Sequence, residues 1–183
     1  MILLEMSFMS KMKAVFIDRD GTIIYDVGYP KEPDQVEILP EVCTALSSLK
    51  DQGFKLIIVS NQSGIGRGIL TLEEVELVHQ RLISVLGKRG ISIDATYYCP
   101  HAPEENCICR KPSPEMFFWA AKDLNVDLTN SFMIGDKISD IEAGKKAGCK
   151  TILLNSGTLG KCDTAPDFVA NDWAAVSSYI LNH

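Results

Sequence analysis

The sequence predicts an α/β fold in which helices cover both faces of a central parallel β-sheet, giving three layers. Two observations predict it. Short apolar runs alternate along the chain with segments of helical periodicity, and no internal repeat or low-complexity tract interrupts them. The apolar runs are also continuous, without the polar alternation of a half-exposed strand, which is typical of strands buried on both faces of a parallel sheet.

Four apolar runs are the clearest predicted strands. They span residues 14–17, 56–59, 132–134 and 151–154. One further short strand is expected between residues 60 and 111. In open α/β sheets the ligand site lies outside the carboxyl ends of the strands. The polar residues that follow the runs are therefore the first candidates for a functional site.

Five helices are predicted from start and stop signals: residues 40–52, 71–89, 113–125, 138–147 and 172–181. The second of them begins at Thr71 and Glu74, which form a capping box. Behind that box, an apolar stripe at helical spacing is expected to face the core. The stripe consists of Leu72, Val75, Val78, Leu82 and Val85.

The composition fits one globular domain, residues 1–183, and excludes several classes of protein. With 46% hydrophobic and 23% charged residues, the chain is neither disordered nor membrane-spanning. A net charge of −6 lacks the basic footprint of a nucleic-acid binder. Six cysteines without an export signal favour a reducing compartment. We therefore expect a cytoplasmic monomer without membrane or nucleic-acid partners, in which residues 1–12 form a ragged N-terminal extension.

Carboxylates follow two of the predicted strands. Asp18 and Asp20 come after the first, and Asp136 and Asp140 come after the third. A turn is the alternative for the first pair, and a helix N-cap is the alternative for Asp140. Neither alternative accounts for three carboxylates at neighbouring strand ends, which would repel one another without a cation. Hard oxygen ligands beside a phosphate are typical of Mg²⁺.

Groups suited to phosphate lie near these acids in the predicted fold. Residues 60–64, Ser-Asn-Gln-Ser-Gly, offer hydroxyls, amides and backbone N–H groups after the second strand. Arg110, Lys111 and Lys137 offer three cations against the four carboxylates. Because the acids outnumber the cations, a divalent metal ion is needed before the site attracts a phosphate dianion.

A second metal site is predicted from a cysteine–histidine loop within residues 99–111. Four ligands of the soft or borderline kind fall within eleven residues: Cys99, His101, Cys107 and Cys109. This set suits a closed tetrahedral zinc site without an open position, so we expect a structural Zn²⁺. The loop leads directly into Arg110 and Lys111, which the zinc would hold in place.

Taken in chain order, these motifs resemble the haloacid dehalogenase-like (HAD) phosphatase superfamily. The shared pattern is D-x-D-G-T at residues 18–22, then Ser60-Asn61, then Lys111, then G-D-x-x-x-D at residues 135–140. The resemblance implies the three-layer Rossmann-like HAD fold. The intervals between motifs are too short for a large cap domain, so a capless member with an open site is expected.

The resemblance also implies roles for individual residues. Asp18 would be the nucleophile that forms an aspartyl-phosphate. Asp20 would be the general acid and then the general base. Ser60 and Asn61 would hold phosphoryl oxygens, and Lys111 would neutralise charge on the transferring group.

The remaining roles concern the metal and the surroundings of the site. Asp136 would bind Mg²⁺ together with Asp18 and the backbone carbonyl of Asp20. Asp140 would orient Lys111 or a metal-bound water. Supporting positions are expected at Thr22 and Lys137, and further substrate contacts are expected at Gln62, Ser63, Arg67 and Arg110.

Within the superfamily, the zinc loop resembles two sister groups. These are the D-glycero-D-manno-heptose 1,7-bisphosphate 7-phosphatases and the histidinol-phosphate phosphatases. Residues 61–68, Asn-Gln-Ser-Gly-Ile-Gly-Arg-Gly, and Gly28-Tyr29 look like the heptose group, whereas the short spacing inside the zinc loop is similar to the histidinol-phosphate enzymes. We therefore expect an enzyme that removes the 7-phosphate of the phosphorylated sugar D-glycero-D-manno-heptose 1,7-bisphosphate, with histidinol-phosphate phosphatase as the alternative. A nucleic-acid 3′-phosphatase and a non-catalytic zinc-stabilised binding module are the remaining alternatives.

Overall fold

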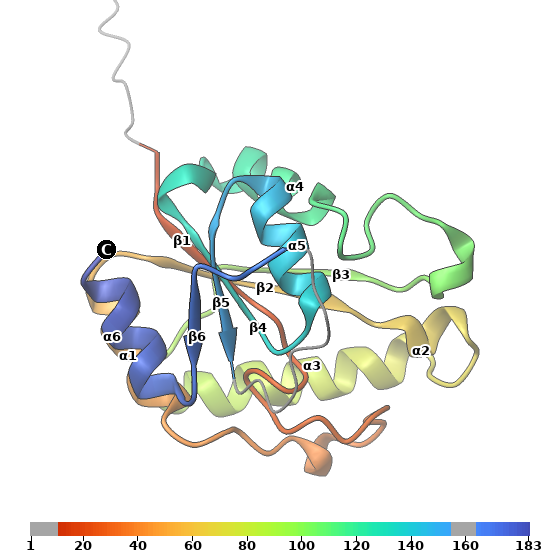
Figure 1. Ribbon diagram of the computed structural model, residues 1–183. Coiled ribbons are helices and arrows are strands. Elements are labelled where there is room, and N and C mark those ends of the chain that lie inside the picture. Colours follow the sequence, from red (N-terminus) through yellow and green to blue (C-terminus); the bar gives the residue numbers. More distant parts are fainter. Residues whose placement is uncertain (1–10, 155–163) are drawn as a thin grey trace, which may run out of the picture.

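Six strands form one parallel sheet in the computed structural model, which describes residues 11–154 and 164–183 (Figure 1). The strand order is β3-β2-β1-β4-β5-β6, and every neighbouring pair is parallel. The strands are β1 (Ala14–Ile17), β2 (Lys55–Asn61), β3 (Ala95–Cys99), β4 (Phe132–Gly135), β5 (Lys150–Leu154) and β6 (Phe168–Ala170). The predicted parallel α/β fold is confirmed.

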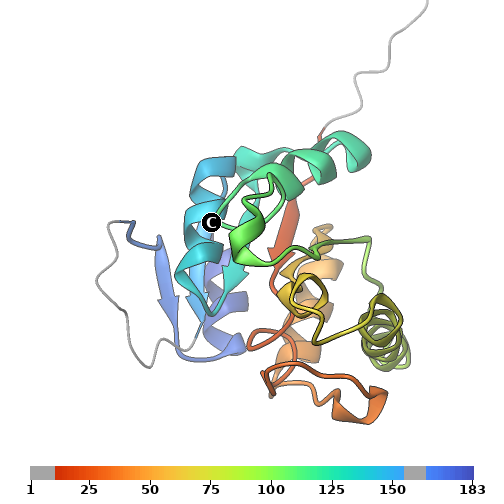
Figure 2. The ribbon, with the colours of Figure 1, turned by 90° about the vertical axis from the view of Figure 1, so that its right-hand side faces the viewer.

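Helices cover both faces of this sheet. They are α1 (Val42–Asp51), α2 (Ser63–Gly66), α3 (Leu72–Gly87), α4 (Glu115–Leu124), α5 (Ile138–Ala147) and α6 (Trp173–Leu181). Short 3₁₀ turns lie at Pro33–Gln35, Pro103–Glu105 and Leu128–Asn130. Figures 1 and 2 show the sheet between a layer with α4 and α5 and a layer with α1, α3 and α6.

Alternate side chains of the central strands enter two separate cores, because successive residues of a strand point to opposite faces. Val15 and Ile17 pack into the core under α1, α3 and α6. Phe16 packs into the core under α4 and α5, where its ring centroid lies 4.7 Å from that of Phe117. Burial on both faces explains why the strands read as continuous apolar runs.

The expected stripe on α3 is wrong at both ends. Leu72 is 55% exposed, and Val85 is only half-buried. The buried stripe runs through Val75, Val78, Leu82 and Leu86. A helix advances 3.6 residues per turn, so after Leu82 the next core-facing position is Leu86. Leu72 stands in the first turn, before the helix passes under the sheet.

The last residue of the predicted N-terminal extension pairs with the segment that follows α4. Met12 forms an isolated parallel bridge with Val126, in which its amide donates to Asn125 O at 2.8 Å and its carbonyl accepts from Asp127 N at 2.8 Å. The rest of the predicted extension, residues 1–10, lies outside the described residues.

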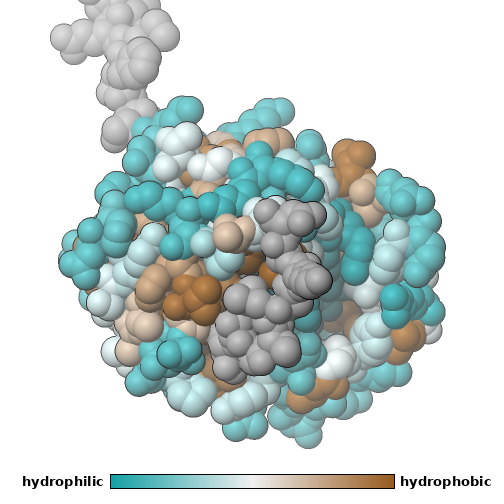
Figure 3. All heavy atoms as spheres, in the orientation of Figure 1, coloured by the Kyte–Doolittle hydropathy of each residue, from teal (hydrophilic) through white to brown (hydrophobic). Residues whose placement is uncertain are grey.

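The visible surface is largely polar. On the face shown in Figure 3, hydrophilic residues predominate and apolar ones lie in small separate groups. Among the described residues, none of the helices has the length and apolar character that a membrane crossing requires.

Candidate active site

Three neighbouring strands bring the predicted acidic and phosphate-binding residues to one edge of the sheet. Asp18 follows β1 and its amide donates to Ile134 O of β4 at 2.9 Å. Ser60 and Asn61 end β2 on the other side of β1. Asp136 follows β4 directly. The central position of β1 therefore places Asp18 between the other two groups.

Lys111 is the buried cation at the centre of this edge. Its ammonium donates to Asp18 Oδ1 at 2.8 Å and to Val59 O at 2.7 Å, and it lies 2.6 Å from Asp140 Oδ1. Burial alone would lower the pKa of Lys111, but the two carboxylates outweigh it and raise that pKa. The lysine is therefore charged and fully engaged by three acceptors.

Asp140 has two partners at the start of α5. Besides Lys111, its Oδ2 accepts from the Lys137 amide at 3.0 Å, as a residue in the first helical turn can do. Burial raises the pKa of Asp140 to about 6, against the opposing effect of Lys111. Of the two predicted roles for Asp140, the orientation of Lys111 is the one with a contact in the structure.

Asp136 carries an unsatisfied acceptor beside Asp18. Its Oδ1 is buried and has no hydrogen-bond partner, and burial raises its pKa to about 6, with Asp18 adding to the shift. One ligand atom each from Asp18, Asp136 and Asp140 lies within 4.8 Å of the others. A buried unpaired oxygen is costly unless something binds it. These residues therefore fit a divalent cation that takes oxygen ligands.

Gly21 makes room for this acid. It has a positive φ of 82°, and a Cβ added there would collide with the Asp136 carboxylate. A side chain at position 21 would therefore be both strained and blocked. Thr22, expected as a supporting residue, is fully buried, and its hydroxyl has no partner.

Asp20 is not one of the three clustered acids. Its carboxylate lies against Arg19, and Gln62 Nε2 donates to its Oδ2 at 2.9 Å. Its side chain therefore does not join the acidic cluster, and only its main chain remains for the predicted metal contact. Arg19 was not predicted as a site residue, although its place between the two aspartates of the first motif was a signal that could have found it.

The side chains at the end of β2 are already paired. Ser60 Oγ accepts from Gln62 Nε2 at 2.9 Å. The amide of Asn61 donates to Lys111 O and accepts from Lys111 N, both at 3.0 Å. Both polar atoms of the Asn61 side chain therefore hold the backbone of Lys111, and the expected contact of Asn61 with phosphoryl oxygens stays a prediction.

Two adjoining cavities separate the acids from the open side of the site. A recess of about 40 Å³ contains Asp18, Ser60 and Lys111. A cavity of about 370 Å³ is lined by further predicted residues, among them Gln62, Ser63 and Arg110. Both are lined by Asp20, Asn61, Lys137 and Ser139. Asp20 therefore stands where the two spaces meet.

The larger cavity also has walls from the segment that follows the first motif and from the start of α5. Asp26, Tyr29 and Ser139 line it. The predicted contact Arg67 is not among its walls, but its guanidinium donates at 3.2 Å to the OH of Tyr29, which is. Lys137 lies 3.1 Å from the Asp26 carboxylate, an ion pair that gives the cavity wall both signs of charge.

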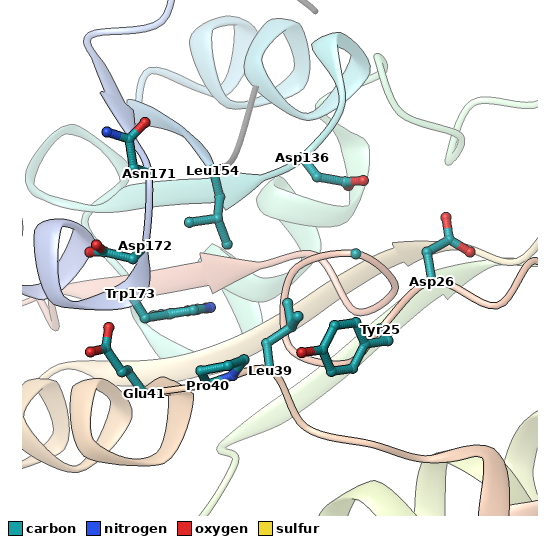
Figure 4. A pocket seen from close by; sticks show the side chains of 11 residues that line it. Tyr25, Asp26, Leu39, Pro40, Glu41, Asp136, Leu154, Asn171, Asp172 and Trp173 are labelled. Atoms are coloured by element: carbon teal, nitrogen blue, oxygen red, sulfur yellow. The ribbon is translucent and has the colours of Figure 1, made fainter. Parts of the chain in front are cut away.

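A third cavity, of about 440 Å³, lies on the other side of Asp136 (Figure 4). Its walls include Tyr25, Leu39 and Trp173, and the Asp136 side chain at its rim points away from Trp173. Trp173 Nε1 donates to Thr22 O at 2.8 Å, which ties α6 to the first motif. The predicted phosphate-handling residues do not line this space.

The cysteine–histidine loop forms a tight cluster at the end of β3. The Sγ of Cys99 lies 3.3 Å from that of Cys107 and 3.5 Å from His101 Nδ1, and the Cys109 Sγ lies 3.3 Å from the same nitrogen. All four ligand atoms lie within 4.8 Å of one another. Burial raises the pKa of Cys99, whereas hydrogen bonds from Cys99 and Cys109 outweigh burial at Cys107 and lower its pKa to about 7. The cluster could hold one tetrahedral metal ion.

Hydrogen bonds join this cluster to the phosphate-handling residues. Gln62 N donates to Cys99 O at 2.7 Å, and Gly66 N donates to Pro100 O at 2.8 Å. Arg110 Nη1 contacts His101 O at 3.4 Å. The loop therefore supports both the turn after β2 and the segment that carries Lys111.

Comparison with known proteins identifies the family. Residues 108–176 match the HAD-hydrolase-like family. A D-glycero-beta-D-manno-heptose-1,7-bisphosphate 7-phosphatase from Helicobacter pylori is 46% identical over 80% of this chain and 85% of its own. One from Yersinia pestis is 41% identical over 87% of this chain and 88% of its own. The chain belongs to this family of HAD phosphatases.

A solved structure agrees with this HAD phosphatase assignment. The D,D-heptose 1,7-bisphosphate phosphatase from B. bronchiseptica, complexed with magnesium and phosphate, is 31% identical and superposes with a TM-score of 0.84. The match covers 93% of this chain and 99% of the other. The predicted membership of the HAD phosphatases and the predicted three-layer fold are both confirmed.

Proposed function

We propose that this HAD phosphatase removes the 7-phosphate of D-glycero-D-manno-heptose 1,7-bisphosphate, with Mg²⁺ and through an aspartyl-phosphate on Asp18. One observation carries the chemistry: Asp18 lies in a small recess with Lys111, and Asp20 stands where that recess meets a larger cavity. Support for the substrate comes from the curated relatives, which are named for this activity.

The nucleophile would be the Asp18 carboxylate, which attacks phosphorus while the bond to the sugar oxygen breaks. Lys111 holds Asp18 by one oxygen and is itself fixed by Asp140 and Val59 O. Its charge would counter the charge on the transferring phosphoryl oxygens without any further movement of the side chain. The Ser60 hydroxyl keeps its proton free to donate to such an oxygen, since it accepts from Gln62.

Asp20 would move the protons. In its protonated form it gives a proton to the departing sugar oxygen, and its carboxylate then takes a proton from the water that attacks the aspartyl-phosphate. The second step restores Asp18 and the protonated Asp20 and releases inorganic phosphate. Because Asp20 borders both cavities, it can reach the oxygen between the phosphoryl group and the sugar.

Asp18, Asp136 and the backbone carbonyl of Asp20 would hold Mg²⁺. The bound ion would supply positive charge that polarises the phosphoryl group and offsets the surplus of carboxylates. Support for this comes from the unpaired buried Oδ1 of Asp136 and from the magnesium in the related structure. The cluster of Cys99, His101, Cys107 and Cys109 would hold a structural Zn²⁺.

The sugar part of the substrate would occupy the cavity of about 370 Å³. Arg110 and Lys137 supply cations on its walls for hydroxyls or for the second phosphate, and Gln62 and Ser63 supply polar groups. We further propose a monomer that acts in the cytoplasm, where a reducing environment keeps the free cysteines available for zinc.

A panel of substrates tests this function. Phosphate release would be measured with Mg²⁺ for the heptose 1,7-bisphosphate, histidinol phosphate and a 3′-phosphorylated oligonucleotide. We expect the highest kcat/KM for the heptose bisphosphate, and no phosphate release from any substrate without Mg²⁺. A higher kcat/KM for histidinol phosphate would contradict the substrate assignment, and activity in excess chelator would contradict the metal requirement.

A further inference from the structure

We propose that Arg19 is a positioning residue that, together with Gln62, turns the Asp20 carboxylate so that its Oδ1 exchanges the proton with the substrate. This inference rests on the proposed function, because it concerns the acid–base step of that reaction. It adds a residue that touches neither the phosphate recess nor the sugar cavity.

Three side chains form a closed ring of hydrogen bonds. Arg19 Nε donates to both oxygens of Asp20, at 3.2 and 3.1 Å, and Arg19 Nη2 donates to Gln62 Oε1 at 3.0 Å. Gln62 closes the ring, since its Nε2 donates to Asp20 Oδ2 at 2.9 Å. Each member is held by the other two, so the carboxylate cannot rotate without breaking at least two contacts.

The two oxygens of Asp20 are not equivalent in this ring. Oδ2 lies 3.0 Å from Arg19 Nη2, 3.1 Å from Arg19 Nε and 2.9 Å from Gln62 Nε2. Oδ1 has the longer contact with Nε alone, at 3.2 Å. With two hydrogen-bond donors on Oδ2 and Arg19 Nη2 3.0 Å away, little of that oxygen remains open to a substrate or a water. Oδ1 keeps that capacity and is the oxygen that would carry the proton.

Burial argues against a general structural role for this ion pair. Arg19 is 3% exposed and the Asp20 side chain is 14% exposed. Buried charges cost more to desolvate than exposed ones, and a buried pair often adds nothing to stability over apolar residues. The buried guanidinium of Arg19 binds Asp20 and Gln62, next to the acids at the strand ends. Orientation of Asp20 accounts for that cost.

A lysine could not reproduce this arrangement. The planar guanidinium donates in two directions at fixed angles, to a carboxylate and to an amide, whereas an ammonium is a single point charge on a flexible chain. The inference therefore predicts that Arg19→Lys keeps the charge next to Asp20 but loses much of the orientation.

The test compares two leaving groups in Arg19→Met and Arg19→Lys. The heptose bisphosphate has an alkoxide leaving group that needs a proton, whereas 2,4-dinitrophenyl phosphate has one that leaves without it. Arg19→Met is expected to lower kcat/KM for the heptose bisphosphate about 100-fold, in the range of lost general acid catalysis, and for the aryl phosphate by less than about 3-fold. For the heptose bisphosphate, the kcat/KM of Arg19→Lys is expected to lie between those of Arg19→Met and the unmodified enzyme. For the aryl phosphate, Arg19→Lys is expected to match the unmodified enzyme.

Two controls separate this role from damage to the fold. Asp20→Asn should show the same selective loss on the heptose bisphosphate. Arg89→Met removes an exposed arginine whose contact is the Cys43 thiol, and should change neither value. If Arg19→Met does not fold, the ratio of the two substrates in Arg19→Lys decides the matter.

Equal losses on both substrates, or full activity of Arg19→Met on the heptose bisphosphate, would overturn the positioning role. Failure of the unmodified enzyme to release phosphate from the heptose bisphosphate would instead count against the proposed function. The unmodified enzyme therefore distinguishes the two failures.

Discussion

At the scale of single residues, the site depends on charges buried in the protein with their partners. Lys111 is nearly inaccessible to solvent and contacts two carboxylates that are themselves buried. Removal of one member of such a group leaves the others uncompensated, which costs far more than the group contributes when intact. The same residues thus determine both stability and chemistry.

Lys111→Met is expected to destabilise the fold by about 3–5 kcal/mol, because Asp18 and Asp140 would lose their common cation. Urea unfolding monitored by circular dichroism measures this free energy. Lys88→Met is a suitable control, since Lys88 is exposed at the end of α3. A loss below about 1 kcal/mol for Lys111→Met would show that the buried group is not held as the contacts indicate.

Magnesium binding is expected to strengthen as pH rises through about 6. Burial and the neighbouring Asp18 raise the pKa of Asp136 to about 6, above its value in the unfolded chain. In the metal-free protein, the ionisation of Asp136 therefore lowers the free energy of unfolding as pH rises through about 6. A proton there competes with the cation. The rise in Tm on adding Mg²⁺ should therefore be larger at about pH 7.5 than at about pH 5.

Asp136→Asn serves as the control for this competition. It should remove most of the Mg²⁺-dependent rise in Tm at both pH values. The same rise at both pH values in the unmodified protein would contradict the competition between proton and cation.

The sequence predicted the positions of those site residues that directly follow a strand. Asp18, Ser60 and Asp136 meet because adjacent parallel strands end at one edge. It did not find Arg19 or the pairing of Asn61 with Lys111, because both depend on the rotamers of residues far apart in the chain.

At the scale of elements, continuous apolar runs predicted the central strands because both faces of the sheet are covered. The same signal fails at the margins. β6 has only the three residues Phe-Val-Ala, with Val169 in its middle 41% exposed, and it was not among the predicted strands. The single turn of α2 follows β2 within a glycine-containing segment that reads as a loop. β6 is instead stabilised by pairing with β5. α2 is stabilised by contact with the cysteine–histidine loop.

Removal of metal from the cysteine–histidine loop is expected to lower both Tm and kcat/KM. The loop is hydrogen-bonded to the turn after β2 and leads into Lys111. Loss of the metal would therefore loosen that turn and the segment that carries Lys111. A tight zinc chelator and Cys107→Ser should give the same change. Cys43→Ser, outside the loop, is the matched control. An unchanged Tm after confirmed loss of zinc would show that the loop keeps its structure without the metal.

At the scale of the whole molecule, the fold leaves the site open. Within residues 11–154 and 164–183, the helices between and after the strands pack against the one sheet. Specificity must then come from the walls of the adjoining cavity and from the substrate's own charges. This fits the short intervals between motifs, from which the capless fold was predicted.

The covalent step through Asp18 is the central claim, and trapping the phosphoryl group tests it most directly. The enzyme would be mixed with Mg²⁺ and the heptose bisphosphate, quenched in acid within the first turnovers, digested and analysed by mass spectrometry. The account predicts a phosphoryl group on the peptide that contains Asp18, and neither the group nor phosphate release with Asp18→Asn. A phosphoryl group on another residue, or an active Asp18→Asn enzyme, would contradict it.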